Sequence, residues 1–401
     1  MKLNLTRRAM LMTGAAAMLA ASLTAGRSAA QDKPTLRFSA VFSDQDIRAR
    51  MMERFAEGVA DLAVMEMHYG GTLFGQGTEL VALQRGNLEM GNIAPQDIAN
   101  QIPAWSILTS AYLFRDPAHL QAFFASDAGA EMKAMAEEQL GIHILGPTYF
   151  GSRHLGLKPE TKINTPADLA GIRLRMPPGE AWQFLGESIG ANPTAMAYAE
   201  VYTGLQTGAI DGQDNPLPNV QNMKFYEVMS QIALTSHLVA FDLLTISSSA
   251  WNAMSAEQQA AFQSAADEAM AWSAAEHQKR EAELADFFRA EGLEVYTPDV
   301  DAFRAYAQEK YLNSPLSADW PAGMVDRINA LCSHCRGDRS GGWSPSITKR
   351  FSHATDRTPD IPLAWPCRRG GGRADAGGDV RVFPDHDPVS LCAQLVVGLG
   401  L

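Results

Sequence analysis

A stretch without proline or glycine runs from Ser255 to Glu291 and ends at Gly292. It opens with Ser255-Ala256-Glu257-Gln258, a capping box in which the serine and glutamine side chains each bind a backbone N–H group that the helix start leaves free. The stretch therefore predicts one long helix, longer than a single small domain needs. Since 401 residues suffice for two domains with a core each, we expect this helix to span both.

Strand and helix patterns alternate through the rest of the chain up to about Leu331. Apolar residues alternate over 36–42 as in a strand and recur at helical spacing over 47–62. Similar patterns predict strands at 64–69, 142–145 and 172–176 and a helix at 79–88, with a break at Gly146-Pro147. This alternation favours an α/β fold in which helices cover parallel sheets.

The N-terminal segment has the pattern of a signal peptide. Lys2, Arg7 and Arg8 precede a largely apolar stretch, and Ser28-Ala29-Ala30 offers a cleavage site after Ala30. We therefore assign residues 1–30 to a signal peptide and expect a periplasmic protein, exported by the general secretory or, because of the paired arginines, the twin-arginine route. No later stretch has about 18 uninterrupted apolar residues, so the mature chain is expected to be soluble.

Charge and cysteine content set further limits. The formal charge of -12 argues against nucleic-acid binding through a general basic surface. All four cysteines lie in 332–401, a segment without glutamate, tyrosine or a sustained period, which we predict to be a disordered and dispensable tail. Cys332-Ser333-His334-Cys335 resembles half of a zinc knuckle, but the other two cysteines are far apart, so no metal site is predicted and a metal-binding extension is the alternative.

One pattern suggests catalysis. Gly186-Glu187-Ser188-Ile189-Gly190 has the spacing of a nucleophile elbow, which needs its serine on a sharp turn between a strand and a helix. The preceding residues 181–185 have a helical pattern instead. We therefore expect no enzyme and no cofactor, and an exported hydrolase that uses Ser188 is the alternative.

The segment from Tyr149 to Tyr226 contains a series of short motifs in order. They are Gly151-Ser152-Arg153, the segment Thr165 to Pro177, Gly190-Ala191-Asn192-Pro193-Thr194, Glu200 to Gly208, Asp211 to Leu217, and Lys224-Phe225-Tyr226-Glu227-Val228. In this series the chain closely resembles the solute-binding subunits of tripartite ATP-independent periplasmic (TRAP) transporters, the DctP family, over essentially Thr35 to Leu331.

The resemblance implies a two-lobed periplasmic binding protein fold with the long helix bridging both lobes. Lobe I is expected at 31–150 with about 241–280, and lobe II at 151–240 with about 281–331. The implied function is capture of a small organic acid, with a C4-dicarboxylate as the default and sugar, keto or aromatic acids as alternatives. The implied partner is the membrane permease, and a subunit that signals to a receptor is the other interpretation. We expect a monomer.

The resemblance also implies ligand-binding residues. Arg175 matches the arginine that pairs with the ligand carboxylate, although Met176 follows it where relatives usually have valine. Arg153 matches a second ligand-facing arginine, Asn215 an amide of the same pocket, and Tyr198 an aromatic position that is often phenylalanine. Gln96 lies near a polar position of the opposing lobe, where the match is loose.

Physical chemistry independently favours arginine for this role. A guanidinium group presents a planar fork that binds both carboxylate oxygens, and it keeps its charge when desolvated. Arg173 shares a strand face with Arg175, but it lies further from the carboxyl end of the strand, where ligands of open α/β sheets bind. We therefore expect Arg173 to be solvated or salt-bridged, and Arg175 to reach the cleft.

Overall fold

The structure, a computed structural model, describes residues 33–331. The predicted signal peptide and the predicted tail from Cys332 lie outside the described residues. In the described part, no helix combines the length and the apolar character that a membrane span requires.

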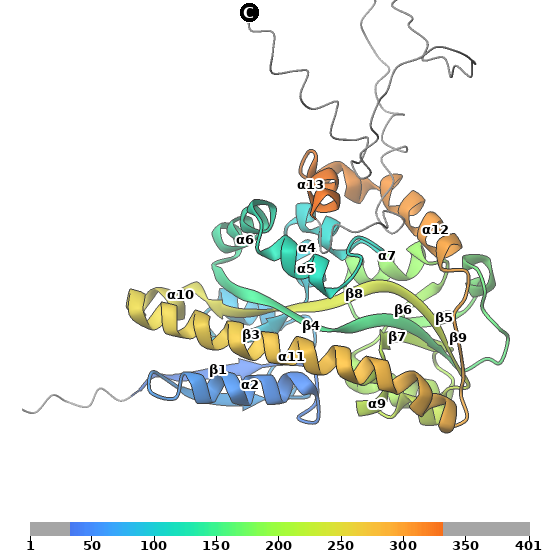
Figure 1. The fold of residues 1–401 in the computed structure, drawn as a ribbon, viewed down its shortest axis with the longest axis horizontal. Helices are drawn as coiled ribbons and strands as arrows, with labels where there is room; N and C mark the ends of the chain where they lie inside the picture. Colours follow the sequence, from blue (N-terminus) through green and yellow to red (C-terminus); the bar gives the residue numbers. More distant parts are fainter. Residues whose placement is uncertain (1–32, 332–401) are drawn as a thin grey trace, which may run out of the picture. The chain divides into compact units, whose positions relative to one another are not determined.

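The secondary structure alternates as predicted (Figure 1). The strands are β1 (Thr35–Ser39), β2 (Val64–His68), β3 (Met90–Ile93), β4 (Ile142–Leu157), β5 (Arg173–Met176), β6 (Asn192–Ala195), β7 (Gly212–Pro216), β8 (Gln231–Ser247) and β9 (Glu294–Tyr296). The α-helices are α2 (Ile47–Gly58), α3 (Glu79–Gln84), α4 (Pro95–Ala99), α5 (Pro117–Phe124), α6 (Asp127–Leu140), α7 (Glu180–Ser188), α8 (Val201–Thr207), α9 (Leu217–Asn222), α10 (Ser248–Asn252), α11 (Ala256–Ala290), α12 (Val300–Leu312) and α13 (Met324–Ala330). Short 3-10 helices are η1 (Pro103–Thr109), η2 (Pro166–Leu169), η3 (Tyr198–Glu200), η4 (Phe225–Val228) and η5 (Pro315–Asp319).

Within residues 33–331 the strands form one mixed sheet in the order β2-β1-β3-β8-β4-β7-β5-β6, with β9 paired to β8. The long strands β4 and β8 pair antiparallel. The β3 strand pairs with the second half of β8, and β7 pairs with the second half of β4, so the two flanks of the sheet lie at opposite ends of the long pair (Figure 1). The expectation of parallel sheets is met only within each flank, because the antiparallel pair of β4 and β8 joins the flanks.

The predicted break at Gly146-Pro147 is wrong, because β4 continues through it to Leu157. The register between β4 and β8 shifts between Ile144 and Gly146, which is a bulge. The bulge leaves Leu145 without a partner in β8, and Gly146 and Pro147 are paired again with Leu244 and Leu243. Pairing with β8 therefore overrides the local break signal.

The predicted long helix is confirmed as α11, which begins after the N-cap Ser255 and has the expected capping box. Near its start, Phe262 packs in one hydrophobic core with Phe55 of α2. Near its end, Phe288 packs in another core with Phe225. The helix thus joins two cores, while the predicted lobe boundaries at 150 and 240 fall inside β4 and β8 and stay a prediction.

Candidate functional site

A pocket of about 620 Å³, its open mouth included, is lined by four of the five predicted ligand residues: Arg153, Arg175, Tyr198 and Asn215. The fifth, Gln96, is buried beside a smaller and mainly apolar cavity, and its side-chain oxygen has no hydrogen-bond partner in the described part of the chain. Phe150 and Trp182 line both spaces. The structure therefore brings together the residues expected from one segment and leaves Gln96 outside the main pocket.

Arg175 lies near the end of β5 and is 1% exposed. Its Nε donates to the Met196 carbonyl (2.8 Å), and its Nη2 donates to Oε1 of Gln76 (3.2 Å). Among residues 33–331, no carboxylate forms an ion pair with Arg175. Burial lowers the pKa of Arg175 to about 9, so the group remains a cation at neutral pH without a counterion. A buried, uncompensated guanidinium is a binding group for an anion.

Arg173, two residues earlier on the same strand, has a different environment. Its side chain is 45% exposed, and its Nη2 lies 2.6 Å from Oδ1 of Asp211. It does not line the pocket. Arg173, expected to be solvated or salt-bridged, thus has an ion pair outside the pocket, and Arg175 lines the pocket; that Arg175 binds the ligand stays a prediction.

Arg153, on β4, lines the pocket but already has a counterion. Its Nε and Nη2 donate to the two carboxylate oxygens of Asp214 at 2.6 and 2.8 Å, and both side chains are buried. His237 Nε2 lies 3.2 Å from the same carboxylate. Burial alone would raise the pKa of Asp214, but Arg153 and His237 together hold it below the ordinary value. Arg153 can therefore donate hydrogen bonds to a ligand in the pocket. Together with Asp214, however, it adds little net charge there.

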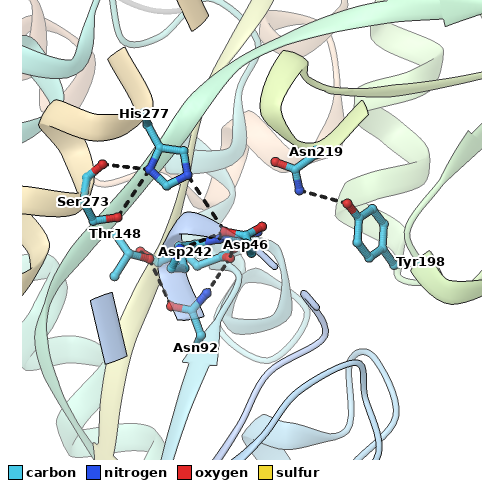
Figure 2. Close-up of polar contacts among 9 residues, drawn as sticks. Asp46, Asn92, Thr148, Tyr198, Asn219, Asp242, Ser273 and His277 are labelled. Atoms are coloured by element: carbon cyan, nitrogen blue, oxygen red, sulfur yellow. Dashed lines mark hydrogen bonds and ion pairs between the residues drawn. The ribbon is translucent and has the colours of Figure 1, made fainter. Parts of the chain in front are cut away.

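The remaining predicted residues complete this side of the pocket. The Asn215 amide donates to Oε1 of Gln213 (2.6 Å). The Tyr198 hydroxyl accepts from Nδ2 of Asn219 (3.1 Å), and the Asn219 oxygen has no partner among the described residues (Figure 2). We call Arg153, Arg175, Tyr198, Asn215 and Asn219 the arginine wall.

Gln96 was the residue expected from the opposing lobe, and none of the residues that line the other side of the pocket was predicted. Arg48, on α2, is buried between the rings of Phe42 and Phe150, whose centroids lie 4.3 and 4.1 Å from its guanidinium carbon. It binds the carboxylate of Asp46, the N-cap of α2, with its Nε and Nη2, and its Nη1 lies 2.8 Å from Oδ2 of Asp242. Two carboxylates thus compensate one cation, which leaves a net negative charge.

Two further carboxylates line this side without an ion pair in the part of the chain that the structure describes. Burial raises the pKa of Glu79, the first residue of α3, to about 7, although backbone N–H groups at the helix start lower it. Burial raises the pKa of Asp97, on α4, to about 8, and the charges of Glu79 and Asp242 add to this effect. Burial also raises the pKa of Asp242 to about 6, against the influence of Arg48.

Hydrogen bonds hold Asp242 in place. Asn92, on β3, donates to its carboxylate (2.7 Å), and the Thr148 hydroxyl on β4 lies 3.0 Å from the Asn92 oxygen (Figure 2). We call Arg48, Glu79, Asn92, Asp97 and Asp242 the acidic wall.

His277 of the long helix α11 lies next to Asp46, which pairs with Arg48 of the acidic wall (Figure 2). Its Nδ1 donates to the Ser273 carbonyl (2.8 Å), so in the neutral ring Nε2 has no proton. That Nε2 lies 3.9 Å from Oδ1 of Asp46 and has no hydrogen-bond partner among residues 33–331. Because burial lowers the pKa of His277 to about 4, the ring is neutral at pH 7, and Arg48 is left as the main counterion of Asp46.

Ser188 does not occupy a nucleophile elbow. It is the last residue of α7, is buried, and donates to the Leu185 carbonyl one turn earlier (2.8 Å). A serine at the C-terminal end of a helix does not lie on the sharp turn from a strand into a helix that a nucleophile elbow needs. The structure therefore does not meet the requirement of the hydrolase alternative, and that alternative is wrong.

Known proteins are similar to this chain in sequence and in structure. Residues 38–315 match the family described as bacterial extracellular solute-binding protein, family 7, or DctP. The sialic acid-binding periplasmic protein SiaP of Vibrio cholerae is 30% identical over 293 residues, which cover 73% of this chain and 89% of that protein.

Solved structures of TRAP periplasmic solute-binding proteins are also similar to this chain. A TRAP periplasmic solute-binding protein from Roseobacter denitrificans, with bound 3-deoxy-D-manno-oct-2-ulosonic acid (KDO), is 44% identical with a TM-score of 0.74, covering 75% of this chain and all of that one. A second one from the same organism, with bound β-D-glucuronate, is 29% identical with a TM-score of 0.68, covering 74% of this chain and all of that one.

The chain therefore belongs to the DctP family of TRAP periplasmic solute-binding proteins, whose members bind their ligands without transforming them. The two-lobed α/β fold with a long bridging helix is confirmed with it.

Proposed function

We propose that this protein captures a sugar acid in the periplasm, holds the carboxylate of that acid on Arg175, and delivers it to the membrane subunits of a TRAP transporter. The KDO-bound relative is 44% identical, and the glucuronate-bound relative is more distant. Both ligands are sugar acids, which favours this class over the C4-dicarboxylate expected from the resemblance.

The observation that carries the proposal is the buried cation without a counterion. Desolvating a charge costs several kcal/mol unless an opposite charge compensates it. The ion pairs of Arg48 and Arg153 meet this requirement, whereas within residues 33–331 Arg175 has only a carbonyl and an amide oxygen as hydrogen-bond partners. A ligand carboxylate on the guanidinium fork would supply the missing charge with two parallel hydrogen bonds.

Delivery would depend on closure of the pocket. Gln76, in the segment before α3, accepts from Arg175 and also from the Tyr198 backbone N–H (2.8 Å). These contacts join the acidic side of the pocket to the arginine wall, and opening the pocket would break them. A ligand held between the walls would favour the closed form, which the permease could distinguish from the open one.

Calorimetry with KDO, glucuronate and succinate tests the proposal on the full chain. Arg175→Ala should weaken sugar-acid binding by roughly thirtyfold or more, because losing one partner of a desolvated charge pair costs about 2 to 5 kcal/mol. Arg175→Lys should recover only part of the affinity, since a single ammonium replaces the planar fork.

Arg173→Ala is the matched control, because Arg173 lies on the same strand and pairs with Asp211 outside the pocket. It should bind as the wild type does. Sugar-acid affinity that survives Arg175→Ala within about threefold would refute the anchor. Binding of succinate but of neither sugar acid would refute the ligand class.

A further inference from the structure

The charges that line the pocket are unequally distributed between its two walls. On the arginine wall, Arg153 is neutralised by Asp214, and Arg175 remains as a cation without a counterion in the described part of the chain. On the acidic wall, Arg48 lies between two carboxylates, and Glu79 and Asp97 add two more acids that have no ion pair among residues 33–331. The pocket therefore offers one site for an anion, and faces it with a surplus of carboxylates.

The two walls are close together. Oε1 of Gln76 lies 3.2 Å from Nη2 of Arg175, and Gln76 precedes Glu79 by three residues in the lining of the same pocket. Glu79 is 3% exposed, so water screens it poorly. A ligand that reaches from Arg175 across the pocket would place its far end against these carboxylates.

The acidic wall presents mainly acceptors at pH 8. There the carboxylates of Asp242 and Glu79 are largely ionised and accept hydrogen bonds without donating any, and Asp97, whose pKa is raised to about 8, is about half ionised. The buried Asn219 oxygen, on the other wall, is a further acceptor without a partner in the described structure. Ligand hydroxyl groups would satisfy these atoms, whereas a second ligand carboxylate would meet like charge at low dielectric. In residues 33–331 no group of three or more histidine, cysteine or acidic side chains is arranged to hold a metal ion that could offset this charge.

We propose that the acidic wall selects ligands with a single carboxylate and a hydroxyl-rich opposite end, and that Glu79 and Asp97 discriminate against dicarboxylates. This inference rests on the proposed function, because it assumes that the ligand carboxylate lies on Arg175. It identifies two specificity residues on the wall opposite the anchor.

Galactonate and galactarate form a matched pair of probes, because they differ only in a terminal alcohol that is a second carboxylate in galactarate. Calorimetry on the full chain at pH 8 should show galactonate binding at least about tenfold more tightly than galactarate. Glu79→Gln and Asp97→Asn, alone and together, should shrink this ratio by weakening galactonate binding and strengthening galactarate binding. Glu131→Gln, an exposed acid paired with Arg327 outside the pocket, is the control and should leave the ratio unchanged.

The outcomes separate the two proposals. Equal or tighter binding of galactarate, or a ratio that both wall variants leave unchanged, overturns the specificity inference, and Arg175-dependent binding of either ligand would still support the proposed function. If KDO binds but galactonate does not, the variants are measured with KDO, and unchanged KDO affinity overturns the inference. If no sugar acid binds, both proposals fail.

Discussion

Three arginines line the two walls of the pocket, and they differ in the number of carboxylates that neutralise their charge. Arg48 contacts two carboxylates, Arg153 contacts one, and Arg175 contacts none among the described residues. All three are buried and all three line the same space. Residue type alone therefore does not identify an anion-binding group. The unpaired charge does, because only that charge gains a counterion when the ligand binds.

The largest expected effect concerns the compensated arginine. Asp214→Ala should lower the free energy of unfolding by about 3 to 5 kcal/mol, because it leaves the buried Arg153 without its partner. Urea denaturation followed by circular dichroism measures this change. Asp211→Ala is the matched control, since its pair with Arg173 is partly exposed and such pairs contribute about 0 to 1 kcal/mol.

Equal losses in the two variants would mean that burial does not distinguish these pairs, and the contrast among the arginines would lose its basis. Added formate offers a further check. A small carboxylate that restores the stability of Asp214→Ala but not that of Asp211→Ala would show that Arg153 then accepts an anion as Arg175 is proposed to do.

The sequence predicted one wall and missed the other for a physical reason. Arg153, Arg175, Tyr198 and Asn215 lie in one segment of ordered motifs, and the position of Arg175 near a strand end sufficed to separate it from Arg173. The acidic wall depends instead on pairs such as Arg48 and Asp242, 194 residues apart, which no local pattern encodes.

In the fold, too, features set by local signals were predicted and features set by distant pairing were missed. Caps and the absence of helix breakers predicted α11 almost to the residue, because these signals act within a single turn. The length of β4 was missed, because it depends on pairing with β8, which begins 74 residues after β4 ends (231 minus 157). Features set by neighbours in sequence were thus predictable, and features set by distant pairing were not.

The second prediction concerns the acidic wall and pH. The pKa of Glu79 is raised to about 7, so the folded protein binds this proton more tightly than the unfolded chain does. Stability should therefore fall as pH rises from about 4.5 to 7 and change no further above that, at a cost of up to about 3 kcal/mol. Glu79→Gln removes the charge, so this variant should be more stable than the wild type at pH 8, with the gap closing towards pH 4.

Urea midpoints at pH 4.5, 6 and 8 measure this gap, and Glu131→Gln is the control because Glu131 is exposed. A gap of constant size at all three pH values would show that the substitution acts through packing, and that Glu79 carries no penalty of ionisation. That result would also weaken the case for the acidic wall as a charged surface.

The smallest effect is expected from Thr148→Val, which keeps the shape of the side chain and removes its hydroxyl. That hydroxyl is buried, and its single hydrogen serves either the Asn92 oxygen at 3.0 Å or the Asp242 carbonyl at 3.1 Å. Losing one such bond costs about 1 kcal/mol. Asn92 still donates to the Asp242 carboxylate, so the wall keeps its charge but holds Asn92 less firmly, and galactonate affinity should fall by about two- to fivefold.

Thr109→Val provides the comparison, because the buried Thr109 hydroxyl donates to the Ser106 carbonyl (2.8 Å) away from the pocket. Both variants should lose similar stability in urea, and only Thr148→Val should weaken galactonate in calorimetry. If the two variants bind galactonate equally, the hydrogen bonds behind Asp242 stabilise the fold without positioning the acidic wall. Discrimination against dicarboxylates would then depend on the charges of Glu79 and Asp97 and not on how firmly Asn92 and Asp242 are held.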